Sequence, residues 1–169
     1  PVNDAPIVTS ERGDTLEDTP VDLTFQGQDV DGSVVALMLH ETPVNGNVTL
    51  ADGLTRVVAG QTISAAQGTA LRFVPNTDFN GDVEIVFSAL DDGGRSSAPG
   101  RYSLTIAPVN DAPMSPPVTL AAIAEDSGAR LITQAELLAN ASDVDSAVLS
   151  ASGLSVATDS GTLVNNGNG

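Results

Sequence analysis

The chain has 169 residues and no cysteine, and its 22 acidic residues against six arginines give a formal net charge of −16. This length allows one or two domains, and the charge argues against nucleic acid, whose affinity rests on basic residues that meet phosphates. The charge and the lack of any apolar run of about 18 residues also argue against membrane insertion.

Short β-strands are predicted along the first hundred or so residues, because apolar and polar residues alternate there with a period of two. Asn-Gly, Asp-Gly and Gly-Gly pairs separate these runs and favour turns. About seven short strands with frequent turn signals are typical of an antiparallel β-sandwich. In chain order, the candidate strands are residues 21–25, 33–40, 47–51, 54–58, 71–73, 83–89 and 102–106.

Three short markers recur in the same order along the chain. The hexapeptide PVNDAP occupies residues 1–6 and 108–113, an offset of 107 (108 − 1). EDT at 17–19 returns as EDS at 125–127, and DVD at 29–31 returns at 143–145. Ordered repetition of this kind predicts homologous units. We expect a complete repeat over residues 1–107, and a linker with the first part of a second, incomplete or interrupted repeat over residues 108–169.

The second repeat departs from the first after its EDS marker. Glu125 and Asp143 are 18 residues apart (143 − 125), whereas Glu17 and Asp29 are 12 apart (29 − 17), so six residues are inserted. Thr133 has capping-box spacing to a glutamate three residues on, which predicts one or two helical turns over residues 133–140. Further strands are expected at 148–149, 154–156 and 163–164. The remainder of this repeat is expected further along the native chain or from another segment.

All three markers carry carboxylate or amide oxygens, which are the ligands that calcium prefers. An Asp-x-Asp taken alone is more often a simple turn, the Asn-Asp pair of the linker can be a solvated hinge, and Glu17 can be an ordinary surface residue. The ordered repetition favours the metal interpretation. Asp18 and Asp92 are expected to be solvated. An EF-hand is excluded, because counting from Asp29 places His40 at position twelve, where glutamate is required.

A family resemblance rests on these markers together with FVPNTDFNGD at residues 73–82 and ALDDGGRSS at residues 89–97. The set resembles the cadherin-like tandem repeats of large bacterial surface adhesins, including RTX-type adhesins. It covers the whole first repeat and the start of the second. The resemblance implies an all-β fold of Ig-like or cadherin-like antiparallel β-sandwich repeats, with a short helix in the incomplete second repeat, and Ca²⁺ at the joints between repeats.

The resemblance also implies the ligands of two joints. For the joint at residues 108–113 they are Glu17, Asp78, Asn110, Asp111, Asp143 and Asp145. Asp78 is the weakest match, because it ends an Asn-Thr-Asp motif where the family has a fully acidic one. For the amino-terminal joint they are Asn3, Asp4, Asp29, Asp31 and Asp91. That site is expected to bind weakly or stay empty, since its upstream neighbour is missing, and Glu125 would serve a later joint.

These expectations point to a calcium-rigidified spacer of a bacterial surface adhesin that acts outside the cell and supports adhesion. Its expected partners are neighbouring repeats of the same chain and a host-surface or biofilm ligand bound through another domain. The alternatives are a split repeat that hosts an inserted ligand-binding domain, a binding module, and a noncatalytic domain of a secreted enzyme. Catalysis has little support, because the chain has one histidine, no cysteine and no GxSxG elbow.

Overall fold

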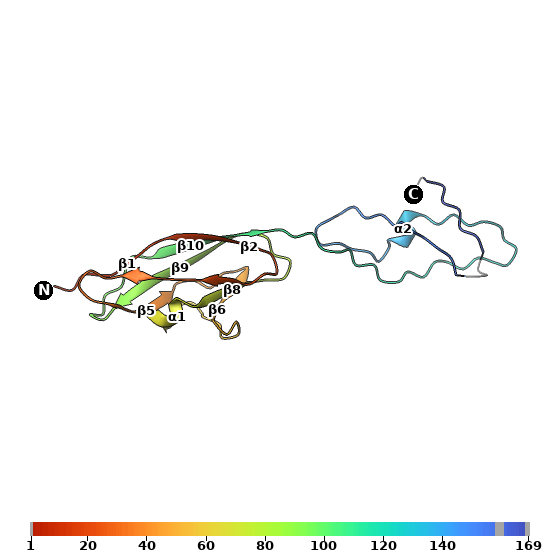
Figure 1. Cartoon of the computed structure of the whole chain (residues 1–169). Coiled ribbons are helices and arrows are strands. Elements are labelled where there is room, and N and C mark those ends of the chain that lie inside the picture. Colours follow the sequence, from red (N-terminus) through yellow and green to blue (C-terminus); the bar gives the residue numbers. More distant parts are fainter. Residues whose placement is uncertain (1, 158–160, 168–169) are drawn as a thin grey trace. The chain divides into compact units, whose positions relative to one another are not determined.

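The computed structural model describes residues 2–157 and 161–167, and the chain divides into two compact units, Pro1–Val109 and Asn110–Gly169 (Figure 1). We call them unit 1 and unit 2. The elements of unit 1 are β1 Ile7–Val8, β2 Glu11–Leu16, β3 Val21–Leu23, β4 Gly27–Gln28, β5 Val34–Leu39, β6 Gly46–Leu50, β7 Thr62–Ser64, α1 Ala65–Gly68, β8 Leu71–Pro75, β9 Gly81–Asp91 and β10 Gly100–Ala107.

Unit 1 is built from three sheets. A five-stranded sheet has the order β2-β10-β9-β5-β7, a three-stranded sheet has the order β3-β8-β6, and β1 pairs with β4. Every pair is antiparallel except β2 with β10, which run parallel. The predicted all-β class is confirmed, and the parallel pair is an addition that the sequence pattern did not indicate.

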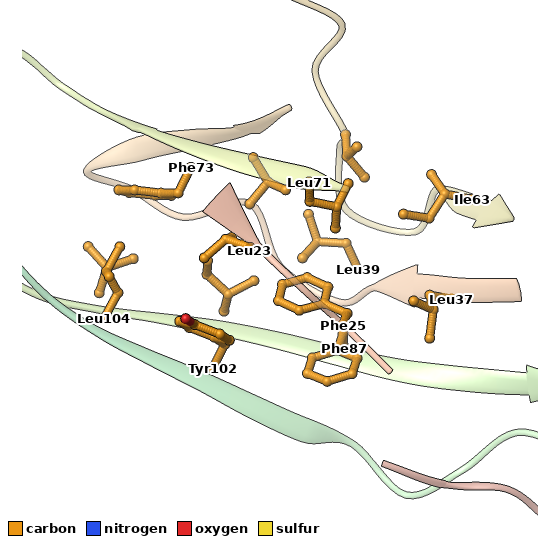
Figure 2. Close-up of a cluster of buried hydrophobic side chains, with 14 of the residues drawn as sticks. Leu23, Phe25, Leu37, Leu39, Ile63, Leu71, Phe73, Phe87, Tyr102 and Leu104 are labelled. Carbon is orange, nitrogen blue, oxygen red and sulfur yellow. The ribbon is translucent and has the colours of Figure 1, made fainter. Parts of the chain in front are cut away.

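The core lies between the five-stranded and three-stranded sheets, where alternate residues of each strand face inward (Figure 2). Phe25 stacks on Phe87 with ring centroids 4.3 Å apart, and Tyr102 lies beside Phe25 at 6.0 Å. The predicted alternation in β9 and β10 is confirmed by burial except at Ser88, which is buried as well. The buried apolar residues of these two strands are Val83, Ile85, Phe87, Ala89, Tyr102, Leu104 and Ile106.

Two local predictions fail for identifiable reasons. The expected strand at residues 54–58 is only an isolated bridge between Arg56 and Thr49, because the Asp52 carboxylate accepts hydrogen bonds from the N–H groups of Leu54 and Thr55 and curls the segment into a turn. The helix α1 was not predicted, although Ser64 and Gln67 form the capping box that opens it.

Unit 2 contains the helix α2 at Gln134–Leu137, which confirms the predicted helical turn and its capping box. The strands expected at 148–149, 154–156 and 163–164 are wrong, since the described part of this unit has one isolated bridge, Met114 with Ser142, and no named strand. In unit 1 the early strands β2 and β3 pair with the late strands β10 and β8. Residues 110–169 hold no counterpart of the segments that form those late strands.

Candidate metal centre

Six oxygen-bearing residues meet at the end of unit 1 where the chain begins, and we call them the N-terminal acidic cluster. The pairing of β1 with β4, through Ile7 with Gln28, brings the residues before β1 beside the loop after β4. Strand β9 ends at the same place. The cluster consists of Asn3, Asp4, Asp29, Asp31, Asp91 and Asp92, and so includes all five ligands predicted for the amino-terminal joint.

Hydrogen bonds fix the cluster to its own backbone. The N–H of Asp4 donates to both carboxylate oxygens of Asp31, at 3.2 and 3.3 Å. The side-chain amide of Asn3 donates to Asp91 Oδ2 at 2.9 Å. Asp92, which we expected to be merely solvated, is exposed but accepts a hydrogen bond from the N–H of Ser33 at 3.3 Å. The linker, the DVD loop and the end of β9 are therefore tied together.

The surroundings of the Asp29 carboxylate indicate whether this cluster suits a metal. Both of its oxygens are buried and have no hydrogen-bond partner among the described residues. A Cβ placed on Gly32 would lie 2.7 Å from Asp29 Oδ2 and closer still to Asp92 Oδ1, so these two carboxylates converge over a glycine. A buried carboxylate without a partner is costly.

Among the described residues, no arginine forms an ion pair with this cluster. The ion pairs found within the described residues join Arg72 to Asp22, Arg101 to Glu84 and Arg130 to Glu136, and none involves the cluster. Carboxylate and amide oxygens without sulfur or imidazole are a donor set for a hard cation. Since the set provides five carboxylates and one amide, its donor chemistry suits calcium, which prefers oxygen ligands of these kinds.

Asp91 is the most buried acid of the cluster, with 2% of its surface exposed. Burial works against its charged form, but hydrogen bonds from the Arg95 backbone N–H, the Asn3 amide and the backbone of Gly93 and Gly94 outweigh it. They hold the pKa of Asp91 below its ordinary value of 3.8. Asp91 is therefore an ionised ligand candidate at any physiological pH.

A second group of polar residues lies where the chain leaves unit 1. Glu17 is 3% exposed, accepts a hydrogen bond from the backbone N–H of Val109, and accepts a second from the amide of Asn80 at 3.2 Å. The N–H of Asp78 donates to Asp18 at 3.2 Å. The structure thus brings the predicted residues Glu17 and Asp78 to one end of unit 1. Asn80, part of the FNGD motif, and Asp18 were not predicted to take part.

The markers of unit 2 repeat two contacts of unit 1, from the linker aspartate to the DVD loop and from the linker asparagine to the next carbonyl. They differ in one respect, because Asp143 accepts hydrogen bonds whereas its counterpart Asp29 has no partner among the described residues. The N–H of Asp111 donates to Asp145 at 2.6 Å, as Asp4 does to Asp31, and the N–H of Asp145 donates to Asp143 at 2.9 Å. The amide of Asn110 donates to the Asp111 carbonyl oxygen at 2.8 Å. All four predicted residues of this unit therefore lie together.

The EDT and EDS turns are also alike. Asp18 has φ 55° and Asp126 has φ 59°, so both adopt the left-handed conformation. In each turn the N–H after this aspartate donates to the carbonyl three residues earlier, from Thr19 to Leu16 and from Ser127 to Ala124. These turns therefore fold in the same way in both units, although the described part of unit 2 has no named strand.

The two units match the models of two different protein families. Residues 3–105, more than half of the chain, match the model of the bacterial Ig domain, and residues 109–169 match that of a cadherin-like domain. The chain belongs to the bacterial Ig domain family. The expected likeness to cadherin-like bacterial repeats is thereby confirmed. Domains of these two kinds are typically noncatalytic and fit an extracellular repeat module.

Solved structures similar to this bacterial Ig domain chain share little sequence with it, and no curated protein matches it. A fibronectin(III)-like module of CbhA from Clostridium thermocellum is 17% identical, with a TM-score of 0.35, covering 61% of this chain and 97% of the module. The PKD domain of an M14-like peptidase from Thermoplasmatales archaeon SCGC AB-540-F20 is 19% identical, with a TM-score of 0.33. The match covers 63% of this chain and 99% of the PKD domain. Across the described residues, no helix is long and apolar enough to cross a membrane.

Proposed function

We propose that this chain is a calcium-stiffened spacer module of an RTX-type bacterial surface adhesin, and that it works outside the cell. The observation that carries the proposal is the buried Asp29 carboxylate, which has no hydrogen-bond partner in the described structure and no ion pair. Such a charge opposes folding until a cation neutralises it. Calcium bound by the N-terminal acidic cluster removes this penalty, so we propose that this site is occupied, in contrast to the sequence-based expectation of a weak or empty site.

We further propose that calcium binds at the PVNDAP linker of residues 108–113. Asn110, Asp111, Asp143 and Asp145 supply oxygens from unit 2, and Glu17 and Asp78 supply them from unit 1. Without calcium these carboxylates repel one another. Calcium replaces the repulsion by shared ligation, so the linker stiffens and successive repeats of the chain form an extended spacer.

The affinity expected of such a site supports an extracellular location. Extracellular calcium modules bind with dissociation constants of about 10⁻⁴ to 10⁻³ M, so they fill in millimolar calcium and stay empty in a cytosol. In this proposal the neighbouring repeats are the direct partners. The ligand on a host surface or in a biofilm is bound by another domain, which the spacer holds away from the cell.

Calcium titration of the full chain tests the proposal. Calcium is expected to raise the melting temperature and to narrow the distribution of sizes seen by small-angle X-ray scattering, and magnesium at equal concentration is expected to do less. Replacing Asp143 and Asp145 by alanine is expected to remove the scattering response. A matched double variant, Glu11→Ala with Asp14→Ala, removes two exposed charges of β2 and is expected to keep it. Equal responses in the two double variants would contradict the proposed linker site.

A further inference from the structure

The strand β2 has one edge paired and the other edge open. It is the last strand of the five-stranded sheet, and its pairing partner in the described structure is β10 alone. The other sheet edges of unit 1 are short or covered. The strands β3 and β7 have three residues each, and β6 is hydrogen-bonded on its outer side to residues 55–57. The six-residue strand β2 is therefore the longest open edge of this unit.

One hydrogen bond identifies the backbone groups that face this open edge. The N–H of Glu17, directly after β2, donates to the Ala107 carbonyl oxygen of β10 at 2.9 Å. Backbone groups of successive residues point to opposite sides of a strand. The N–H groups of Arg12, Asp14 and Leu16 therefore point away from β10. A row of outward-facing backbone groups is a template for pairing with another strand.

Opposite charges lie two residues apart on the outer face of β2. Arg12 and Asp14 are both exposed, and the ion pairs found among the described residues include neither of them. Gly13, which lies between them, faces the core, since a Cβ placed on it would lie 2.6 Å from the Tyr102 hydroxyl oxygen. Arg12 and Asp14 therefore share the face that is turned away from the core, where a partner can reach both charges.

Two copies of this edge fit together in one register. A two-fold axis normal to the sheet makes the two strands antiparallel, and both members of each hydrogen-bonded pair must face the partner. With the axis at Gly13, Arg12 of each copy lies opposite Asp14 of the other. Each of these pairs exchanges two backbone hydrogen bonds and sets opposite charges beside each other on one face. Gly13 suits the axis, because the Cα atoms of such a non-hydrogen-bonded pair approach to about 4.5 Å.

The same charges disfavour the neighbouring registers. Moving the axis one residue toward the start of β2 sets Arg12 opposite Arg12 of the second copy, and moving it one residue toward the end sets Asp14 opposite Asp14. Like charges directly opposite each other destabilise a strand pair. Charged side chains on an edge strand usually protect a sheet against pairing. On β2 they oppose the neighbouring registers but favour the one that is self-complementary.

We propose that the open edge of β2 is a self-association surface, at which two copies of this chain pair antiparallel through Arg12 and Asp14. The five-stranded sheets of the two copies then form one continuous sheet. The contact does not rest on the proposed spacer role, because neither residue is a candidate calcium ligand. Its affinity is expected to be low, since each copy carries a net charge of −16 and the copies repel. Dilute samples used to follow the calcium response therefore remain monomeric.

Sedimentation equilibrium of the full chain in EDTA tests the proposal, at about 0.15 M NaCl to screen the long-range repulsion. The average mass is expected to rise from that of a monomer toward that of a dimer between micromolar and millimolar concentration. Arg12→Asp and Asp14→Arg each set like charges opposite each other, so each variant alone is expected to dimerise roughly tenfold more weakly. Wild type that stayed monomeric at millimolar concentration would overturn the proposal, and the calcium proposal would be unaffected.

Mixing the two charge variants tests the register itself. In a mixed pair, two negative charges of one copy face two positive charges of the other, so the mixture is expected to dimerise about as well as the wild type. The double variant Arg12→Asp with Asp14→Arg exchanges the charges within one chain and is expected to dimerise by itself. Arg56→Asp, at another exposed arginine, changes the net charge as Arg12→Asp does and is expected to leave dimerisation unchanged. A monomeric mixture, or an equal loss in Arg56→Asp, would overturn the proposed contact.

Discussion

Replacing Asp29 by asparagine should reverse the effect of calcium on stability. Asparagine keeps the shape of the side chain and removes its charge. In EDTA the wild type carries a buried carboxylate whose two oxygens have no partner in the described structure. Leaving such a group unsatisfied costs about 1–3 kcal/mol. The Asp29→Asn variant is therefore expected to be more stable than the wild type in EDTA, by about 1 kcal/mol.

In calcium the order is expected to change. At about 10 mM calcium and a dissociation constant between 10⁻⁴ and 10⁻³ M, binding to the folded state stabilises the wild type by about 1.4–2.7 kcal/mol. For a domain of this size each kcal/mol shifts the melting temperature by about 4–8 °C. The wild type is therefore expected to gain about 6–22 °C, whereas the variant gains little.

Urea denaturation and calorimetry in EDTA and in calcium measure both quantities, with sodium chloride added to equalise the ionic strength, because calcium also screens the acidic surface. Asp14→Asn, on the exposed side of β2, is the matched control and should respond to calcium as the wild type does. If Asp29→Asn were less stable than the wild type in EDTA and gained as much from calcium, our interpretation of Asp29 would be refuted.

Three further predictions concern unit 1. Phe87→Ala removes the ring stacked on Phe25 and is expected to cost about 3–5 kcal/mol in urea denaturation. Gly46→Ala places a Cβ against the Phe73 ring and 2.7 Å from the Val74 carbonyl oxygen, so it is expected to cost about 1–3 kcal/mol by the same measurement. Because the folded state lowers the pKa of Asp91, its stabilising effect is full above the unfolded value near 3.8 and is lost as the pH falls through the folded pKa. Asp91→Asn should therefore flatten the acid-induced fall in the urea midpoint below about pH 4.

The core of unit 1 was predictable where its strands alternate apolar and polar residues, as in β8 and the first part of β9. Leu71, Phe73, Val83, Ile85 and Phe87 all follow the period of two, and all are buried. The strand β2 was not predictable in this way. Its sequence ERGDTL has no apolar face, and it forms because β10, far along the chain, offers an edge for pairing. Local sequence carries no signal for such a non-local partner.

The candidate site was predictable through repetition rather than through any single motif. The linker, the DVD loop and the ALDDG turn were expected to supply ligands, and Asn3, Asp31 and Asp91 do lie together. Asn80 was missed because its amide contacts Glu17 only through the folded arrangement of two distant segments. The strands predicted for unit 2 are absent from its described residues for a similar reason. The first strands of a repeat need its last strands as hydrogen-bonding partners.

An anomalous-scattering map from crystals grown in millimolar calcium tests the central proposal most directly. A calcium peak is expected within about 2.3–2.6 Å of the Asp29 carboxylate, with other oxygens of the N-terminal acidic cluster around it. A second peak is expected beside Asn110 and Asp143. Crystals at full calcium concentration with only water beside Asp29 and along residues 108–113 would contradict the calcium-stiffened spacer.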